Sequence, residues 1–150
     1  MEQPWRQFEE VVAQFLASLE VSAKVTHDIH LPDRDTGKPR QRDVWIEWNA
    51  LNHFPTKMLV SCKRWSKPLD QKDIDHFNGE FLSSRAHIGV IYSYSGFNDN
   101  AVEKARALGF HCCQLLDDAP SPIPRTLVLG LAYLFRVQWR VSASVESQSY

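Results

Sequence analysis

The stretch LVSCKRWSKP, residues 59–68, begins like a buried strand and ends in exposed cations. Side chains alternate across a strand, so Leu59, Ser61 and Lys63 share one face. A lysine on the same face as a core leucine has to emerge where the strand ends. The end of this strand is therefore the first place in the chain to look for chemistry.

Composition and length favour one soluble globular domain. The 150 residues include 43% hydrophobic and 23% charged side chains, which is ordinary for such a domain. No signal peptide opens the chain, and the longest apolar run, 127–135, is about half of the ~20 residues that span a bilayer. Three cysteines without metal-ligand spacing argue against a disulfide framework and a zinc site. We therefore expect a cytoplasmic protein without a membrane segment.

The net charge of −1 conceals a basic segment. Residues 34–72 contain nine Lys or Arg and four Asp or Glu, so this segment is +5 and the remainder −6. A localised basic stripe on a neutral protein suggests contact with an anion such as nucleic acid. The alternative is a solvated loop face, and composition does not decide between them.

Hydrophobic periodicity predicts a mixed α/β sheet in the order α-β-β-β-α-β-α-β. Helical spacing covers 4–19, and Asp70 and Asn98 or Asp99 are candidate caps of two further helices, which end near Ser83 and Leu108. Gly109 would stop the last of them. Strand patterns cover 23–31, 43–48, 57–63, 87–94 and 110–116, with a turn-rich basic loop over 32–42. An antiparallel meander thus leads into parallel crossover units.

The C-terminal part is expected to be an extension. We place a domain at 1–118, and a linker and strand-like extension at 119–150, with a plausible boundary in DDAPSPIP, 117–124. Alternating side chains over 131–141 are typical of a strand. It could pack on the core, mediate self-association or begin a further domain.

Asp43 and Lys63 form the candidate catalytic pair. Asp43 begins one predicted strand and Lys63 ends the next, so a hairpin would bring a carboxylate beside an ammonium. Glu9, at the edge of the first helix's apolar face, can reach the same corner. Carboxylates that hold a divalent ion, with a lysine that orients water or stabilises phosphate charge, suit phosphodiester hydrolysis. The alternative is a simple Asp–Lys ion pair that closes the hairpin.

Four motifs, in order, resemble a known family. They are FEEVVAQFL (8–16), TGKPRQRDVWIE (36–47), VSCKRWSKPL (60–69) and YSYSGFNDNAVEKARALGF (92–110). Together they resemble the Mrr-like restriction endonucleases of the PD-(D/E)XK nuclease superfamily. The resemblance implies a restriction-endonuclease-like fold and a DNA endonuclease that uses Mg²⁺, with Mn²⁺ as a substitute, against foreign or modified DNA. Whether the protein forms a homodimer is not decided by the sequence.

The resemblance also implies roles for individual residues. Asp43 would be the metal-binding aspartate, Lys63 the catalytic lysine, and Glu9 the helical acid that contacts the metal through water. The backbone carbonyl of Cys62 would complete the ligand set. Ser61 stands where the family usually has Glu or Gln, and its shorter, neutral side chain cannot easily reach an ion.

A helical acid could replace the missing carboxylate. Some enzymes of the superfamily have Ser-X-Lys on the strand and take the acid from the following helix, which here offers Asp73, Asp75 and Glu80. The alternative is that all three are surface charge.

The candidate nucleic-acid contacts are basic residues around this corner. Arg and Lys there would position a duplex through its phosphates without reading its sequence. Two other hypotheses stay open beside the endonuclease: a nucleic-acid-binding or sensor module with a weakened metal site, and a scaffold that assembles through its C-terminal strand. The candidate contacts are Arg40, Arg42, Arg64 and Lys67.

Overall fold

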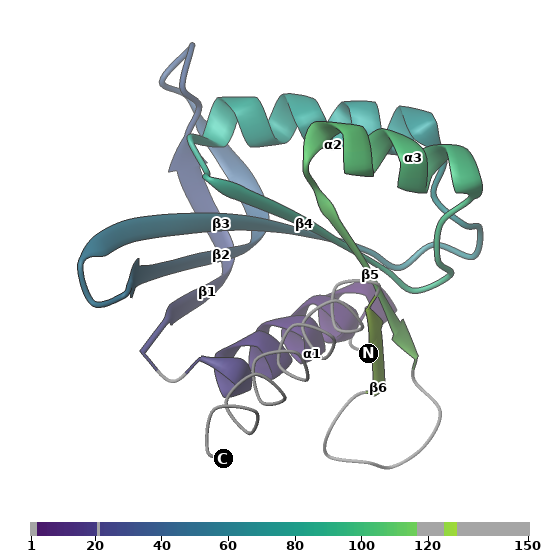
Figure 1. Cartoon of the computed structure of the whole chain (residues 1–150), viewed down its shortest axis with the longest axis horizontal. Helices are drawn as coiled ribbons and strands as arrows, with labels where there is room; N and C mark the ends of the chain where they lie inside the picture. The colour runs from purple at the N-terminus through teal and green to yellow at the C-terminus, as the bar shows by residue number, and fades with distance from the viewer. Residues whose placement is uncertain (1–2, 21, 117–124, 129–150) are drawn as a thin grey trace, which may run out of the picture.

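The sheet contains six strands in the order in which they occur in the chain (Figure 1). The computed structural model describes residues 3–20, 22–116 and 125–128. Pairing is antiparallel between the first three strands, parallel from the third to the fifth, and antiparallel again to the sixth. The predicted mixed sheet is therefore confirmed. Its strands are β1 (Lys24–Pro32), β2 (Pro39–Ala50), β3 (Phe54–Lys63), β4 (Ile88–Ser93), β5 (His111–Leu116) and β6 (Arg125–Val128).

Local signals place the three helices where the sequence predicts them: α1 (Pro4–Leu19), α2 (Gln71–Ser84) and α3 (Asp99–Leu108). Asp70 caps α2 in a capping box, in which its carboxylate accepts the Asp73 N–H and the Asp73 carboxylate accepts the Asp70 N–H. Asn98 caps α3, and Gly109 ends it with a φ of 78°. None of the helices in the described part of the chain is long and apolar enough to cross a membrane.

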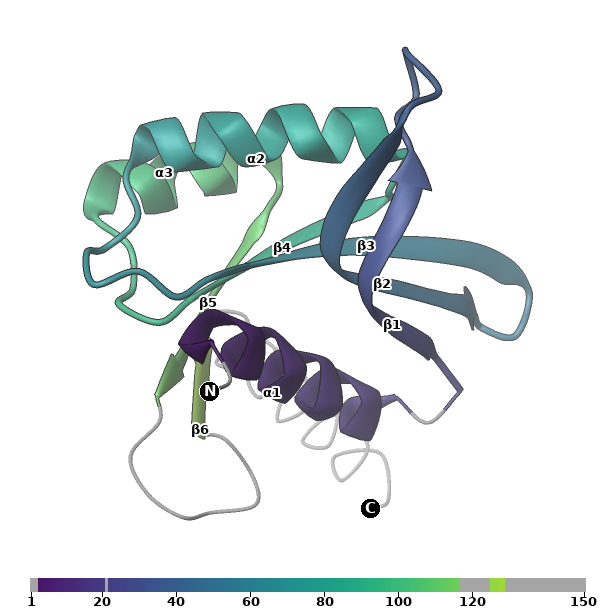
Figure 2. The ribbon, with the colours of Figure 1, turned by 180° about the vertical axis from the view of Figure 1, so that it is seen from behind.

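The helices cover both faces of the sheet, which gives three layers (Figures 1 and 2). On one face Phe8 and Val12 of α1 pack against Val44, Val60 and Tyr92. On the other, residues of α2 and α3 pack against different side chains of the same strands. That second core contains Trp45, Leu59, Ile74, Phe77, Ile91, Ala101, Ala105 and Phe110.

The hairpin of β1 and β2 bends away from the sheet at Asp43. Pairing of β1 with β2 continues to Pro32 and Pro39, whereas pairing of β2 with β3 stops at Val44 and Val60. Beyond this point the hairpin turns toward the C-terminal end of α2, where the Arg34 N–H donates to the Ser83 carbonyl at 2.8 Å. The bend opens the sheet beside Asp43.

Two boundaries differ from the sequence-based expectation by three residues or more. β2 begins at Pro39, so the predicted loop over 32–42 is wrong in its last four residues, because pairing with β1 extends the strand. β3 begins at Phe54 and includes Pro55, which a strand tolerates at its start. β6 lies within the predicted extension and pairs with β5, while 117–124 and 131–141 lie outside the described residues.

Candidate active site

Asp43 lies inside β2, not at its beginning, at the point where β2 leaves β3. Its Oδ2 accepts the Cys62 N–H at 2.7 Å and lies 3.3 Å from the Ser61 hydroxyl, which donates to it. The antiparallel register continued by one residue places Ser61, not Lys63, opposite Asp43. Within the described residues Oδ1 has no hydrogen-bond partner and is not a buried atom, so this oxygen is free to bind a ligand.

Lys63 ends β3 and does not pair with Asp43. The ion pairs among the described residues are Glu9–His27, Asp33–Arg40 and Asp75–Lys104. A simple Asp–Lys pair that closes the hairpin is therefore absent here, and that alternative is wrong. The Lys63 ammonium instead lies 5.9 Å from the centre of the Trp65 ring.

Glu9 is more buried than its predicted place at the edge of the apolar face of α1, with 6% of its surface exposed. Its Oε2 lies 3.1 Å from His27 Nε2. Burial raises the pKa of Glu9; the hydrogen bond with His27 opposes the rise, and the charges of Asp43 and Asp28 add to it. A buried acid that responds to Asp43 belongs to the same electrostatic site.

Cys62 joins the site through its backbone. Burial, together with the negative charges of Asp43 and Glu9, raises the pKa of its thiol, and the Lys63 ammonium opposes the rise. The thiol is therefore neutral, so it is a poor ligand for a hard cation. Only the carbonyl that the family resemblance implies remains as a donor from this residue.

The donor set matches an ion that retains its waters. In the part of the chain that the structure describes, no three His, Cys, Asp or Glu side chains lie together as a metal site. Mg²⁺, however, is usually bound through one or two carboxylates, several waters and substrate phosphates. Asp43 with its free Oδ1, and Glu9 nearby, fit this reduced coordination.

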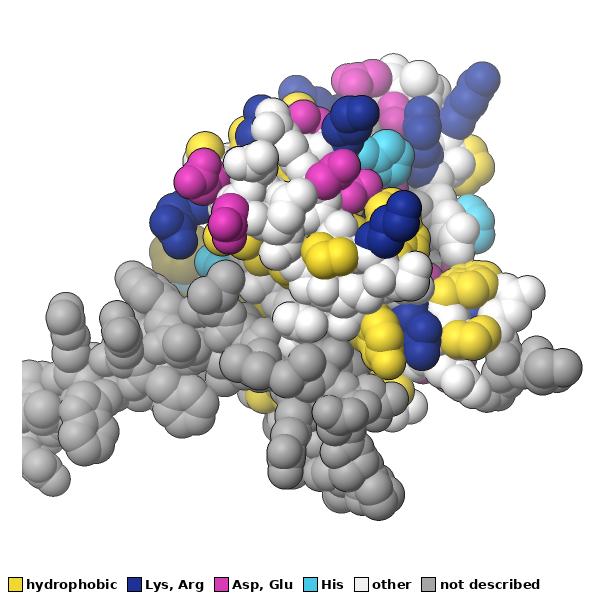
Figure 3. Space-filling view, turned by 90° about the vertical axis from the view of Figure 1, so that its right-hand side faces the viewer, with side chains coloured by type: hydrophobic (Ala, Val, Ile, Leu, Met, Phe, Trp, Pro, Cys, Tyr) yellow, Lys and Arg dark blue, Asp and Glu magenta, His cyan; other side chains and the backbone are white. Residues whose placement is uncertain are grey.

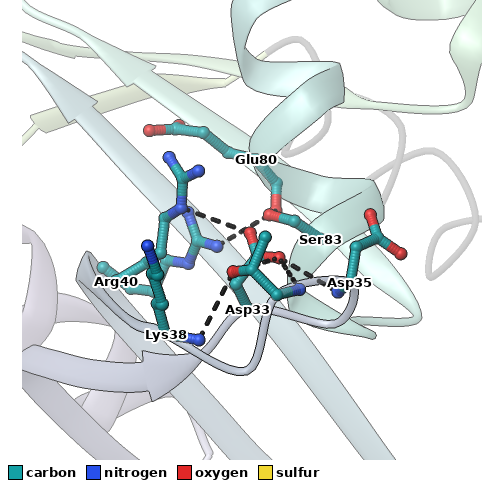
Figure 4. Close-up of polar contacts among 8 residues, drawn as sticks. Asp33, Asp35, Lys38, Arg40, Glu80 and Ser83 are labelled. Carbon is teal, nitrogen blue, oxygen red and sulfur yellow. Dashed lines mark hydrogen bonds and ion pairs between the residues drawn. The ribbon is translucent and has the colours of Figure 1, made fainter.

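Two of the three candidate helical acids have other partners. Asp73 closes the capping box of α2, and Asp75 forms an ion pair with Lys104 of α3 at 3.2 Å. Glu80 lies near the other end of α2, where its backbone carbonyl accepts the Ser83 hydroxyl at 2.9 Å (Figure 4). These contacts favour structural roles for Asp73 and Asp75. They disfavour the idea that either residue replaces the metal-binding carboxylate that Ser61 lacks.

We define the Asp33 corner as Asp33, Arg40, Arg42 and Ser83, which contain one ion pair and one hydrogen bond from a buried arginine (Figure 4). Asp33 Oδ1 accepts the backbone N–H groups of Asp35 and Thr36, and its Oδ2 lies 3.2 Å from Arg40 Nε. The hydrogen bond from the Thr36 N–H is the main cause that lowers the pKa of Asp33. Arg42 is only 4% exposed and donates to the Ser83 hydroxyl at 2.8 Å.

The predicted phosphate contacts therefore separate into two groups. Burial contradicts a role for Arg42 in DNA contact, and Arg40 is exposed but paired with Asp33. Arg64 and Lys67 are exposed in the loop after β3. The two groups lie at opposite ends of α2, whose 14 residues span about 20 Å. The basic stripe in the sequence is not one surface.

His27 and Asp28 belong to this region, although the sequence did not indicate them. Asp28 lies opposite Asp43 where the β1–β2 ladder is interrupted, and its φ is 50°. Its Oδ1 accepts the side-chain amide of Gln41 at 2.5 Å. Two adjacent polar residues within a strand pattern were the available signal, but only the register links them to Asp43.

An α-β-β-β-α-β-α-β sheet with an aspartate and a lysine on neighbouring strands defines the restriction-endonuclease-like class of nuclease folds. The chain belongs to the restriction endonuclease family of Mrr-type catalytic domains, whose family model matches residues 1–119. Membership indicates a nuclease domain of the restriction type. PD-(D/E)XK nucleases generally use divalent metal ions.

Structural comparison supports the fold alone. The chain is similar to the crystal structure of a protein of unknown function, AF1548, with a TM-score of 0.57 and 16% sequence identity. The match covers 72% of this chain and 56% of that one. No curated protein matches the sequence.

Proposed function

We propose that the protein is a Mg²⁺-dependent DNA endonuclease, with Mn²⁺ as a substitute, and that Asp43, Lys63 and Glu9 form its active site. The observation that carries the proposal is the opening between β2 and β3. There, among the residues that the structure describes, one carboxylate oxygen of Asp43 has no hydrogen-bond partner and Lys63 has no carboxylate partner. The family resemblance further suggests cytoplasmic action on foreign or modified DNA.

Each residue has a separate task in this proposal. Asp43 would hold the ion through Oδ1 while the Cys62 N–H fixes its other oxygen. Glu9 would contact a water of the ion, and the Cys62 carbonyl would be a further donor. A bound Mg²⁺ would polarise the phosphate and acidify a water. Lys63 would orient the attacking water or neutralise charge that develops on the phosphate oxygens.

Ser61 favours a second candidate function. Its hydroxyl bonds to Asp43 at 3.3 Å, where the family usually has an acid or amide. With one carboxylate fewer, the same fold could bind nucleic acid without cutting it. The proposal and this alternative differ in one observable, which is cleavage.

Plasmid cleavage with Mg²⁺ and with Mn²⁺ tests the proposal. Wild type should nick or linearise the plasmid, and Lys63→Ala purified in the same way should not. Equal cleavage by both proteins would place the activity elsewhere or in a contaminant. Binding of DNA without any cleavage by wild type would favour the second candidate.

A further inference from the structure

The loop after β3 begins with Arg64 and Trp65, two side chains to which the proposed hydrolysis assigns no task. Trp65 is 46% exposed, and the Lys63 ammonium lies 5.9 Å from its ring centre. The Arg64 guanidinium lies 4.1 Å from the centre of the Tyr94 ring. Both distances are within the ~6 Å range of cation–π contacts. We call Lys63, Arg64, Trp65 and Tyr94 the Trp65 platform.

The backbone holds the Trp65 platform in place. The Tyr94 N–H donates to the Lys63 carbonyl at 2.9 Å, and the Ser95 hydroxyl donates to the Trp65 carbonyl. The Tyr94 ring also meets Phe8 of α1 edge to face, with ring centres 6.1 Å apart. A surface that is already ordered loses little conformational entropy when a ligand binds.

Core packing does not explain the position of Trp65. Trp45 shows what a core tryptophan looks like in this fold, because it is 4% exposed and packs against residues of the second core. Trp65 leaves nearly half of its surface in water two residues after the candidate catalytic lysine. Figure 3 looks onto this end of the molecule, where basic and hydrophobic side chains lie next to one another on the surface.

The charge of the surface indicates its ligand. Lys63, Arg64 and Lys67 form no ion pair with any carboxylate in the described residues. Unpaired cations suit phosphates, and an exposed aromatic ring suits the flat face of a base. Bases in an intact duplex stack on each other, so only an unpaired base can offer its face to Trp65.

We propose that the Trp65 platform stacks on an unpaired base of DNA, next to the phosphate that Lys63 contacts. The protein then prefers DNA with a bulged, flipped or single-stranded nucleotide over an intact duplex. This inference rests on the proposed function, because it takes DNA as the ligand of the same site.

The test is a binding measurement by fluorescence anisotropy in EDTA, which prevents cleavage. The probes are a labelled 20-mer duplex, the same duplex with one bulged nucleotide, and an RNA duplex with the same bulge. Wild type should bind the bulged DNA at least about 5-fold more tightly than the intact duplex. Trp65→Ala should lose about 5- to 150-fold on the bulged DNA, and Trp65→Phe should keep most of the affinity because it keeps a ring.

Phe54→Ala is the matched control. Phe54 is also an exposed aromatic, at 58%, but it begins the strand that Lys63 ends, about 30 Å away. Its loss should not change any affinity. Equal binding of the bulged and intact duplexes by wild type, or unchanged binding by Trp65→Ala, would overturn the inference. Tighter binding of the bulged RNA would also overturn it, because DNA would then be the wrong ligand.

Cleavage separates this inference from the proposed function. A protein that cuts plasmid in a Lys63-dependent way but binds the bulged and intact duplexes equally refutes only the role of Trp65. A protein that prefers the bulge through Trp65 but cuts nothing supports the inference and refutes the endonuclease.

Discussion

Charged residues lie near both ends of α2, and the two groups differ in whether their charges are bonded within the fold. At its C-terminal end the charges of the Asp33 corner are held within the fold, since both oxygens of Asp33 accept from neighbours and the buried Arg42 donates to the Ser83 hydroxyl. Toward its N-terminal end Asp43 uses one oxygen only, and Lys63, Arg64 and Lys67 have no carboxylate partners among the described residues.

The difference separates charges that hold the fold from charges available to a ligand. A buried or internally paired group stabilises the chain around it, and its loss should appear in unfolding. A charge without a partner contributes little to stability, and its loss should appear in binding or catalysis. The predictions below test this division, from the largest expected effect to the smallest.

Asp43→Asn should lower plasmid cleavage by at least about 100-fold, which is the usual cost of losing one group that stabilises reaction charge. The amide oxygen can still accept the Cys62 N–H, so the urea midpoint should change little. Asp33→Asn is the matched control. It should lower the urea midpoint and leave cleavage intact, and the reverse pattern would contradict the division.

Arg42→Ala should lower the free energy of unfolding by about 2 kcal/mol, because a buried charged hydrogen bond to Ser83 is lost. Arg64→Ala, at an exposed position, should change it by less than about 0.5 kcal/mol. Urea denaturation of both variants gives the comparison. A larger loss for Arg64→Ala would show that the assignment of the two arginines is wrong.

Arg64→Ala and Lys67→Ala should each weaken DNA binding and reduce the slope of log affinity against log salt by about one, since each removes a phosphate contact. Arg40→Ala should have a smaller effect, because its guanidinium is paired with Asp33. Anisotropy titrations from 50 to 200 mM salt, about the range over which such contacts weaken, measure the slopes. Equal slopes for all three variants would contradict the claim that the basic residues at the two ends of α2 differ in their availability to DNA.

Glu9→Gln should stabilise the fold slightly at neutral pH while impairing cleavage. Burial raises the pKa of Glu9 above 4.5, so its favourable contribution is full below pH 4.5 and is lost as the pH rises through the folded-state pKa. The Gln amide does not ionise, so the variant does not lose this stability as the pH rises. The urea midpoint of Glu9→Gln should therefore exceed that of wild type at pH 7, and the two should converge below pH 4.5. A variant that is less stable at pH 7 would contradict this cause.

Local signals predict much of the fold and part of the site. The caps Asp70, Asn98 and Gly109, and the helical and strand periodicities, fix the order of elements. The proximity of Asp43 to the end of β3 follows from the hairpin. These features depend on neighbours in the sequence.

The bend of the β1–β2 hairpin could not be predicted in this way. In straight strands Arg42 would share a face with Val44, and Ile29 would share one with Val25. Instead Val25 and Val44 pack on the α1 side, while Ile29 packs in the second core and Arg42 bonds to Ser83 of α2. The change of face occurs at Asp28 and Asp43. It depends on tertiary contacts with α2, and it buries Arg42 and opens the site.

Metal titration of wild type and Ser61→Glu tests the central claim most directly. With one strand carboxylate fewer, wild type should cut plasmid only at high Mg²⁺ or preferentially with Mn²⁺, which binds such sites more tightly. Ser61→Glu should cut at a lower metal concentration for half-maximal activity. If wild type is inactive at every metal concentration and Ser61→Glu gains activity, the natural domain is a binding module and the endonuclease account is wrong.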